Sequence, residues 1–111
     1  MKIMVLGAGL MGPAAAFNAM TDPAVTKVTV CDLDEDQLAQ CRARLEDKPG
    51  AHKVVYQPLD LSDQDATMAA MKDHQAGIAA LPRAASLLAI PSVLKTGLAL
   101  MDLTRIPDKV I

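Results

Sequence analysis

Three glycines near the start of the chain have the spacing of a phosphate-binding turn. Gly7, Gly9 and Gly12 form the pattern Gly-x-Gly-x-x-Gly, directly after a short apolar run and before an alanine-rich segment. In such a turn the first glycine permits a sharp bend, the second lets the backbone approach a pyrophosphate, and the third lets a helix pack against a strand. The pattern alone is weakly specific, but its place between a strand and a helix is the context that dinucleotide binding requires.

A carboxylate stands at the matching distance from these glycines. Asp32 ends the second predicted strand, twenty residues after Gly12, and a carboxylate there can accept hydrogen bonds from both hydroxyls of an adenosine ribose. It would also repel a 2′-phosphate. An arginine that clamps such a phosphate usually lies within a few residues of the carboxylate, whereas Arg42 and Arg44 stand farther along the chain. We therefore predict NAD as the cofactor, with NADP as the minor alternative. The competing interpretation is that Asp32 only caps the turn that follows it.

Further cofactor contacts are predicted where the other strands end. Asp60 follows the third strand, where its carboxylate or the backbone of Leu61 could meet the adenine edge; a turn-capping role for Asp60 is the equal alternative. The end of the fourth strand lies beside the first strand across the switch point, where ligands bind in sheets of this kind. The predicted cofactor-binding residues are Gly7, Gly9, Leu10, Met11, Gly12, Asp32, Leu33, Asp60, Leu61, Ala80, Leu81 and Pro82.

The chain offers little else that could perform chemistry. His52 stands in a turn and His74 near a helix end, and both are expected to be exposed to solvent. Cys31 and Cys41 lack metal-binding spacing, so we expect buried, reduced thiols, which fits a cytoplasmic protein. No catalytic residue and no metal ligand is therefore predicted. The net charge of −2, without a basic stripe, argues against nucleic-acid binding, and the interrupted apolar region at residues 77–100 argues against a membrane span.

The elements that must position these residues alternate between strand and helix. Short apolar runs predict five strands, at residues 3–6, 27–31, 53–59, 76–81 and 98–103. Four helices are predicted between them, ending near residues 20, 45, 74 and 96. This alternation indicates an α/β fold, a Rossmann-type doubly wound parallel sheet of five strands in the order 3-2-1-4-5 with helices on both faces. Pro58 cannot donate to a ladder, which favours an edge position for the third strand.

The start of the second helix has a capping signature. Asp34 is the expected N-cap, because its carboxylate can accept hydrogen bonds from the free amides of the next turn. Gln37 stands three residues later, where its side chain can reach back to the cap. The pair predicts a capping box at this helix.

The whole chain resembles the N-terminal NAD(P)-binding part of the saccharopine dehydrogenase family, which includes lysine 6-dehydrogenases and carboxynorspermidine-type reductases. The resemblance rests on four stretches, "VLGAGLMG", "VTVCDLDEDQL", "LDLSD" and "AALPRAASLLAIPSVLKTGLALMDLT". The last is the most specific, since family members similarly follow the fourth strand with a small-residue–proline turn, a helix, a glycine, and a strand that ends in Asp-(Leu or Thr)-(Thr or Ser). The likeness implies that Asp102, Leu103 and Thr104 lie near the nicotinamide end of the cofactor.

The resemblance implies that the chain is the cofactor domain of a saccharopine- or lysine-type amino-acid dehydrogenase of lysine metabolism. Such an oxidoreductase moves a hydride between nicotinamide and an amine-bearing carbon, and its substrate groups lie mostly in a larger domain that follows. We therefore expect residues 1–111 to be one nucleotide-binding domain, truncated from a two-domain enzyme and inactive alone, which could form a homodimer through its exposed fifth strand. The alternative is a stand-alone regulatory module that senses NAD(H) or another adenine nucleotide. Chain length disfavours FAD, and glycine spacing disfavours S-adenosylmethionine.

Overall fold

Strands and helices alternate along the chain, as the sequence predicts. The computed structural model describes residues 1–9, 11–81 and 83–102, with side chains for all of these except 83–86 and 102. A turn of 3-10 helix, η1 (Ala51–Lys53), precedes the third strand. The other elements, in chain order, are β1 (Lys2–Leu6), α1 (Gly12–Met20), β2 (Lys27–Asp32), α2 (Glu35–Leu45), β3 (Val54–Pro58), α3 (Gln64–Lys72), β4 (Ala76–Ala79), α4 (Arg83–Thr96) and β5 (Ala99–Asp102).

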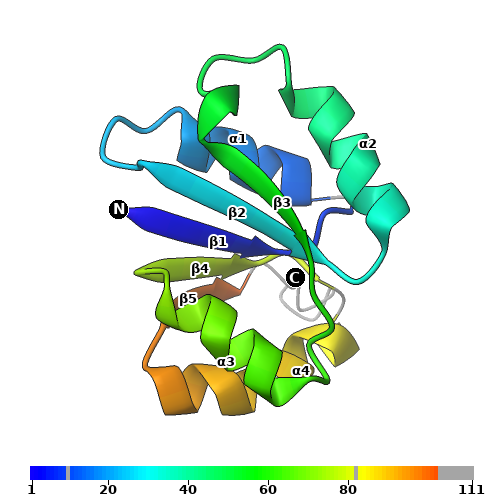
Figure 1. The fold of residues 1–111 in the computed structure, drawn as a ribbon, viewed down its shortest axis with the longest axis vertical. Coiled ribbons are helices and arrows are strands. Elements are labelled where there is room, and N and C mark those ends of the chain that lie inside the picture. Colours follow the sequence, from blue (N-terminus) through cyan, green and yellow to red (C-terminus); the bar gives the residue numbers. More distant parts are fainter. Residues whose placement is uncertain (10, 82, 103–111) are drawn as a thin grey trace, which may run out of the picture.

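The strands form one parallel sheet in the order β3-β2-β1-β4-β5, which confirms the predicted topology (Figure 1). Leu6 pairs with Cys31 of β2 and with Ala79 of β4, so the C-terminal ends of the three central strands are level. Pro58 is the last residue of the edge strand β3 and lies opposite Asp32. The strand order therefore confirms the edge position predicted from Pro58. An edge strand tolerates a residue that has no N–H to donate.

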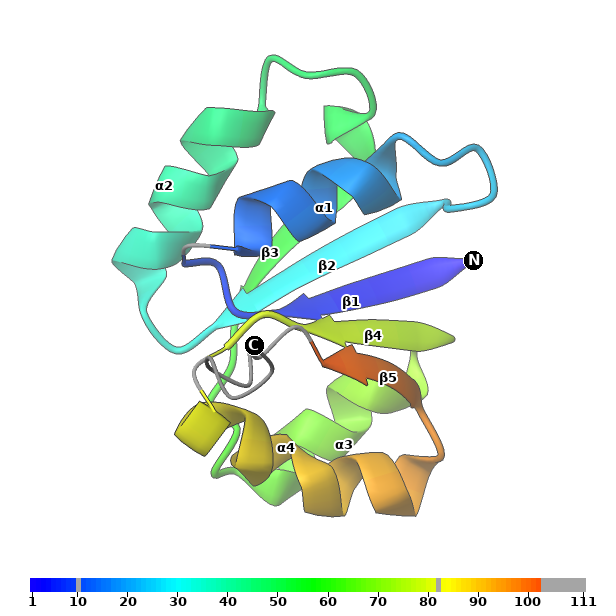
Figure 2. The ribbon, with the colours of Figure 1, turned by 180° about the vertical axis from the view of Figure 1, so that it is seen from behind.

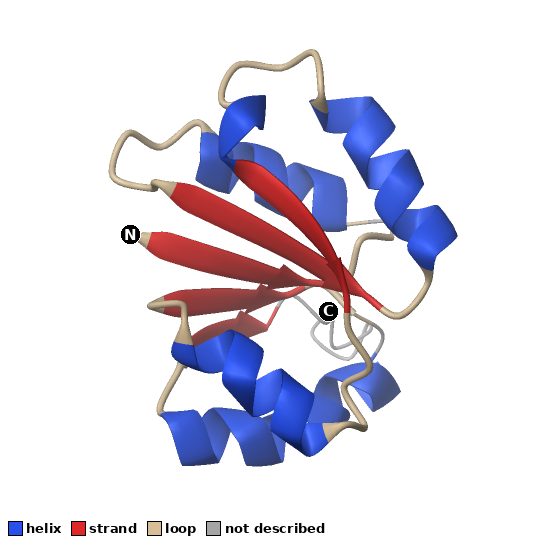
Figure 3. Cartoon of the chain, viewed as in Figure 1, coloured by secondary structure: helices blue, strands red, loops and turns tan. Residues whose placement is uncertain are grey.

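Helices cover both faces of the sheet (Figures 2 and 3). α1 and α2 lie on one face, and α3 and α4 lie on the other. Ile3 and Val5 of β1 pack into the core beneath α1 and α2, whereas Met4 and Leu6 pack into the core beneath α3 and α4. A strand buried on both faces consists of a continuous run of apolar residues, which is why β1 could be recognised from sequence. Its C-terminal end therefore opens between the two helical layers.

Small residues bring α1 close to the sheet. Ala15 and Ala16 are 6% and 0% exposed, and no larger side chain separates the helix from β1 at these positions. Pro13 lies in the first turn, where its missing N–H costs no helical hydrogen bond. The helix ends at Met20, and the hydroxyl of Thr21 donates to the carbonyl of Phe17. α1 thus begins directly at the level where the central strands end.

α4 is the most apolar of the helices on its outer side. Leu87, Leu88 and Leu94 are exposed by 54%, 50% and 78%, and Pro91 lies inside the helix. Nevertheless, none of the helices in the described part of the chain is long and apolar enough to cross a lipid bilayer.

Candidate functional site

Two glycines of the loop between β1 and α1 are required by the fold itself. Gly7 has φ = 104°, and a Cβ there would lie 2.5 Å from the carbonyl oxygen of Ala80. At Gly12, the first residue of α1, a Cβ would collide with the carbonyl oxygen of Gly7. These positions therefore provide the sharp turn and the close helix–strand contact that their spacing predicts.

Gly9 differs from the other two glycines. Its φ lies outside the positive range, and the nearest described atom to a Cβ built there is Oε1 of Gln37, at the ordinary contact distance of 3.7 Å. The described fold therefore has room for a side chain at this position. A pyrophosphate laid against the loop would occupy that room, which is the role assigned to the second glycine of the pattern.

The N–H groups beside Gly9 are available to an anion. Among the described residues, no acceptor is found for the backbone N–H groups of Gly9, Met11 and Gly12. These groups surround the N-terminus of α1, whose first turn contains no acidic residue. Free amides and the positive end of a helix dipole together favour a phosphate.

Asp32 joins the glycine loop to the start of α2. The half-buried carboxylate accepts a hydrogen bond from the N–H of Ala8 at Oδ2 (2.8 Å) and from the N–H of Asp34 at Oδ1 (2.9 Å). Asp32 therefore does cap the turn that follows it, as the competing interpretation expects. That role does not exhaust the carboxylate, because each oxygen keeps a second lone pair for a ribose hydroxyl.

The predicted capping box of α2 is half right. Asp34 is the N-cap, and its Oδ1 accepts hydrogen bonds from the N–H groups of Asp36 (2.9 Å) and Gln37 (3.4 Å). The expected return bond from the Gln37 side chain is wrong, because Asp32 already accepts from the N–H of Asp34. The carboxamide of Gln37 instead faces Gly9 and bonds to no described residue. Sequence reasoning noticed Gln37 only as a capping residue.

The end of β3 lies beside Asp32, but the carboxylate of Asp60 is committed to its own turn. The N–H of Leu59 donates to the carbonyl of Asp32 at 3.0 Å. Oδ1 of Asp60 accepts from the hydroxyl of Ser62 (2.6 Å) and from its N–H (2.9 Å), and these bonds hold the pKa of Asp60 below its ordinary value. This geometry matches the turn-capping alternative. Leu61 is half-buried and packs against the core under α3 and α4.

The segment after β4 also meets the glycine loop. The N–H of Ala80 donates to the carbonyl of Leu6 at 2.7 Å, and the Leu81 side chain approaches the position of a Cβ on Gly7 to 2.8 Å. The structure thus brings Gly7, Gly9, Gly12, Asp32, Ala80 and Leu81 together at the C-terminal edge of the sheet. Met11 and Leu33 are exposed there by 41% and 69%, while Leu10, Pro82, Leu103 and Thr104 lie outside the described residues.

The charges at the start of α2 are acidic. Asp34, Glu35 and Asp36 are exposed and follow Asp32 after one intervening residue. Arg42, the nearest arginine along the helix, lies over the ring of Tyr56 with its guanidinium carbon 4.9 Å from the ring centroid. That stacking directs Arg42 toward β3, so it packs on an aromatic face.

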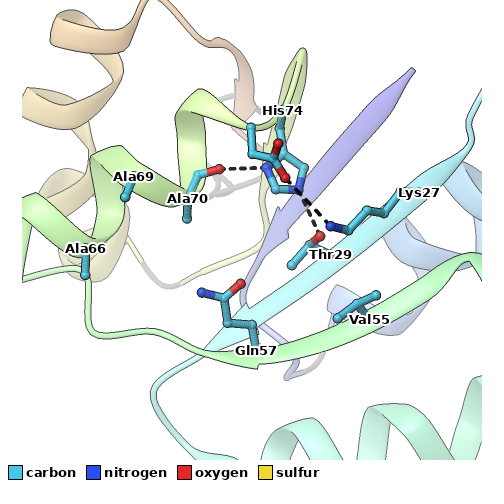
Figure 4. Close-up of a pocket in the computed structure, with 9 residues that line it drawn as sticks. Lys27, Thr29, Val55, Gln57, Ala66, Ala69, Ala70 and His74 are labelled. Atoms are coloured by element: carbon cyan, nitrogen blue, oxygen red, sulfur yellow. Dashed lines mark hydrogen bonds and ion pairs between the residues drawn. The ribbon is translucent and has the colours of Figure 1, made fainter.

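A cavity of about 540 Å³ lies on the face of the sheet that carries α3 (Figure 4). None of the residues predicted to bind the cofactor lines it, and His74 forms one of its walls. The lining residues are Lys27, Thr29, Val55, Gln57, Ala66, Ala69, Ala70, Asp73 and His74.

His74 is buried, so its predicted exposure is wrong. It is 8% exposed, with Nδ1 2.7 Å from the carbonyl oxygen of Ala70 and Nε2 2.8 Å from the hydroxyl of Thr29 (Figure 4). The carbonyl can only accept, so Nδ1 carries a proton and Nε2 is free to accept from Thr29. His74 is a satisfied structural residue, whereas His52 is exposed as predicted.

The cysteines are buried and unpaired, as predicted. Cys31 and Cys41 are 2% and 1% exposed, and neither forms a disulfide. Burial, and then the charge of Asp32, raises the pKa of the Cys31 thiol to about 12, so this thiol is a poor nucleophile. Within the described ranges, no three His, Cys, Asp or Glu side chains are grouped so as to hold a metal ion.

Comparison with known protein families gives a match over almost the whole chain. The family model described as the saccharopine dehydrogenase NADP binding domain matches residues 3–110. The matched span contains the glycine loop, Asp32, all of β2 to β5, and β1 except for its first residue.

Solved structures with the same fold are distant in sequence. Saccharopine dehydrogenase (L-Glu forming) from Saccharomyces cerevisiae is 19% identical with a TM-score of 0.72, over 95% of this chain and 22% of that one. Pen from Bacillus thuringiensis is 12% identical with a TM-score of 0.73, over 91% of this chain and 36% of that one. A Rossmann-fold NAD(P)-binding family protein from Shigella flexneri is 15% identical with a TM-score of 0.67, over 89% and 49%. This chain thus spans about a fifth of the yeast enzyme's length.

Proposed function

Because this chain belongs to the family of saccharopine dehydrogenase NADP binding domains, we propose that it binds a nicotinamide dinucleotide through its glycine loop and Asp32. The observation that carries the proposal is the open space beside Gly9. The described fold leaves room for a side chain there and needs no unusual backbone angle, yet the residue is the second glycine of the dinucleotide pattern. A pyrophosphate against the loop accounts for that glycine.

The pyrophosphate, the adenosine ribose and the segment that leads to the nicotinamide each have a candidate partner in the chain. The N–H groups of Gly9, Met11 and Gly12 would hold the pyrophosphate, and the carboxylate of Asp32 would accept from the adenosine ribose. Ala80 and Leu81 would border the segment that leads to the nicotinamide. When bound, the nicotinamide ring supplies the site that accepts or gives a hydride.

We infer a preference for NAD over NADP from the charges around the ribose position. The family's description names NADP, whereas residues 32–36 of this chain contain four carboxylates and no base. A 2′-phosphate would be repelled by Asp32, and Arg42 is occupied by Tyr56.

We infer further that the cofactor serves an oxidoreductase acting on an amine-bearing carbon of an amino acid. Family membership supports this substrate class. No described group at the site is placed as a general acid or base, and the chain covers 22% of the yeast saccharopine dehydrogenase. Both facts support a substrate domain outside these 111 residues.

Calorimetric titration of this chain with NAD⁺ and NADP⁺ tests the proposal, with Gly9→Ala as the diagnostic variant. We expect NAD⁺ to bind more tightly than NADP⁺. Gly9→Ala should weaken NAD⁺ binding by about tenfold or more, or about 1.4 kcal/mol, because its methyl group takes the space of the pyrophosphate. The stability of the variant should be unchanged or slightly raised, because alanine is compatible with this backbone.

Three outcomes of the titration would count against the proposal. Absence of heat with both nucleotides would refute dinucleotide binding by this chain. Tighter binding of NADP⁺ would refute the discrimination assigned to Asp32. Unchanged affinity in a folded Gly9→Ala variant would show that the loop does not carry the pyrophosphate.

A further inference from the structure

The side chain of Gln37 is the nearest described neighbour of the glycine loop at Gly9. Gln37 lies in the first turn of α2, is half-buried, and places Oε1 3.7 Å from the position of a Cβ on Gly9. The carboxylate of Asp32 connects the loop to the start of α2, because it accepts hydrogen bonds from the N–H of Ala8 and from the N–H of Asp34. Gln37 therefore lies against Gly9, in the loop that Asp32 ties to the start of α2.

The carboxamide of Gln37 is free because of an exchange of partners. A capping box would tie it to the N–H of Asp34, but that N–H donates to Oδ1 of Asp32 at 2.9 Å. Only the backbone N–H of Gln37 takes part in the cap, at 3.4 Å from Oδ1 of Asp34. Among the described residues, the side chain thus keeps its full hydrogen-bonding capacity while it points at the proposed site.

The surroundings favour a hydroxyl as the partner of this carboxamide. A carboxamide both donates and accepts hydrogen bonds, as a ribose hydroxyl does, whereas a phosphate oxygen only accepts. The same turn carries Glu35 and Asp36, and Asp34 caps it, so negative charge close to Gln37 is disfavoured. The neutral part of a dinucleotide nearest to Asp32 is the adenosine ribose.

We propose that Gln37 is a second ribose-binding residue, which hydrogen-bonds the hydroxyls of the adenosine ribose together with Asp32. This inference rests on the proposed function, because it assigns a residue to the same nucleotide site. It explains why Gln37 is half-buried against the loop although its predicted capping bond is absent. It also assigns the adenosine half of the site two polar side chains.

The test compares two nucleotides that differ only at the ribose. The dissociation constants of ADP and of 2′,3′-dideoxyadenosine diphosphate are measured by NMR titration, which reaches millimolar values, for the unaltered chain and for Gln37→Ala. We expect Gln37→Ala to weaken ADP binding by about 2- to 12-fold, the range for one neutral hydrogen bond. With the dideoxy nucleotide the same substitution should change the affinity by less than about 2-fold, because no hydroxyl is left to bind.

Gln40→Ala is the matched control, since Gln40 is exposed on the same helix, one turn farther from its start. It should leave both affinities within about 2-fold of the unaltered chain. A Gln37→Ala penalty of equal size for both nucleotides would overturn the inference, because it would assign the contact to the phosphates or to the loop. A folded Gln37→Ala variant without any penalty would overturn it as well.

The outcomes also separate this inference from the proposed function. If the unaltered chain binds NAD⁺ and ADP but Gln37→Ala behaves like Gln40→Ala, only the role of Gln37 is refuted. If the unaltered chain binds neither nucleotide, the proposed function is refuted and the inference falls with it. Far-UV circular dichroism of each variant establishes that the comparison is made between folded proteins.

Discussion

The backbone N–H of Ala8 donates a 2.8 Å hydrogen bond to Oδ2 of Asp32, which ties the glycine loop to the end of β2. Oδ1 of the same carboxylate accepts from the N–H of Asp34, the N-cap of α2. One side chain therefore sets the positions of the loop and of the second helix. An adenosine held at this site would lie between those two elements.

Replacing Asp32 should affect both nucleotides, but unequally. Asp32→Ala removes the acceptor for the ribose and releases the N–H of Ala8, so we expect NAD⁺ binding to weaken by about 1–3 kcal/mol. NADP⁺ should lose less, because the repulsion between the carboxylate and its 2′-phosphate disappears. Calorimetric titration with each nucleotide measures the difference.

Asp36→Ala provides the control for charge alone. Asp36 is exposed in the first turn of α2, four residues after Asp32, and its carboxylate bonds to none of the described loop residues. A small effect there, beside a large one at Asp32, would separate specific contact from general electrostatics. Equal losses of NAD⁺ and NADP⁺ affinity in Asp32→Ala would contradict the discriminating role of this carboxylate.

Gly12→Ala should damage the fold, in contrast to Gly9→Ala. A Cβ at position 12 would collide with the carbonyl oxygen of Gly7, so α1 would have to move away from β1. Overpacking of this kind costs about 1–3 kcal/mol. Urea unfolding of the two variants measures the contrast, since each adds a single methyl group to the same loop. Equal stabilities would show that the close approach of α1 to β1 is not required.

Local patterns account for most of the fold. The apolar run of β1, the small residues of α1 and the proline of β3 are each encoded within a few adjacent residues. The alternation of strands and helices, supported by that proline, predicts the strand order that the structure has. The positions of the three glycines and of Asp32 at one edge of the sheet were predictable for the same reason. A strand–turn–helix unit places these residues by local chain geometry. The cofactor-binding roles of these residues stay a prediction.

The errors concern contacts between residues that are distant in sequence or that compete for one partner. His74 lies between α3 and β4, and its buried side chain contacts the hydroxyl of Thr29, which is 45 residues away in β2. The capping bond of Gln37 is absent because Asp32 takes the N–H of Asp34 first. The first contact depends on how the fold places the end of α3 over β2, and the missing bond depends on the direction of the Asp32 carboxylate. Neither quantity can be read from spacing along the chain.

Thr29→Val should destabilise the chain without touching the glycine loop. The substitution keeps the shape of the side chain but leaves Nε2 of His74 buried without its partner, at a cost of about 1–3 kcal/mol in the free energy of unfolding. Thr26→Val is the matched control, because Thr26 is exposed and should change stability by about 0.5 kcal/mol or less. Urea unfolding measures both. Equal effects would show that the His74–Thr29 hydrogen bond contributes nothing specific.

Alkaline pH should destabilise the chain through the buried thiol of Cys31. Burial raises the pKa of this thiol from 9.0 to about 12, so the folded state keeps a proton that the unfolded state loses. Below about pH 9 both states hold the proton, and the stabilisation is complete. As the pH rises from about 9 toward about 12, the unfolded state binds fewer protons, and the free energy of unfolding falls by up to about 1.4 kcal/mol per pH unit for this group.

The pH effect is measured by urea unfolding at about pH 8 and about pH 10.5. At about pH 8 the thiol is protonated in both states, and at about pH 10.5 the ionisation of an unfolded cysteine differs most from that of Cys31. Cys31→Ala should be less stable at both values, because it leaves a cavity, but its stability should fall less between them. Tyr56→Phe should flatten the decline in the same direction, since burial also raises the pKa of Tyr56 from 10.0 to about 12. If Cys31→Ala loses as much stability between the two pH values as the unaltered chain, then the thiol is not the group that carries the alkaline loss.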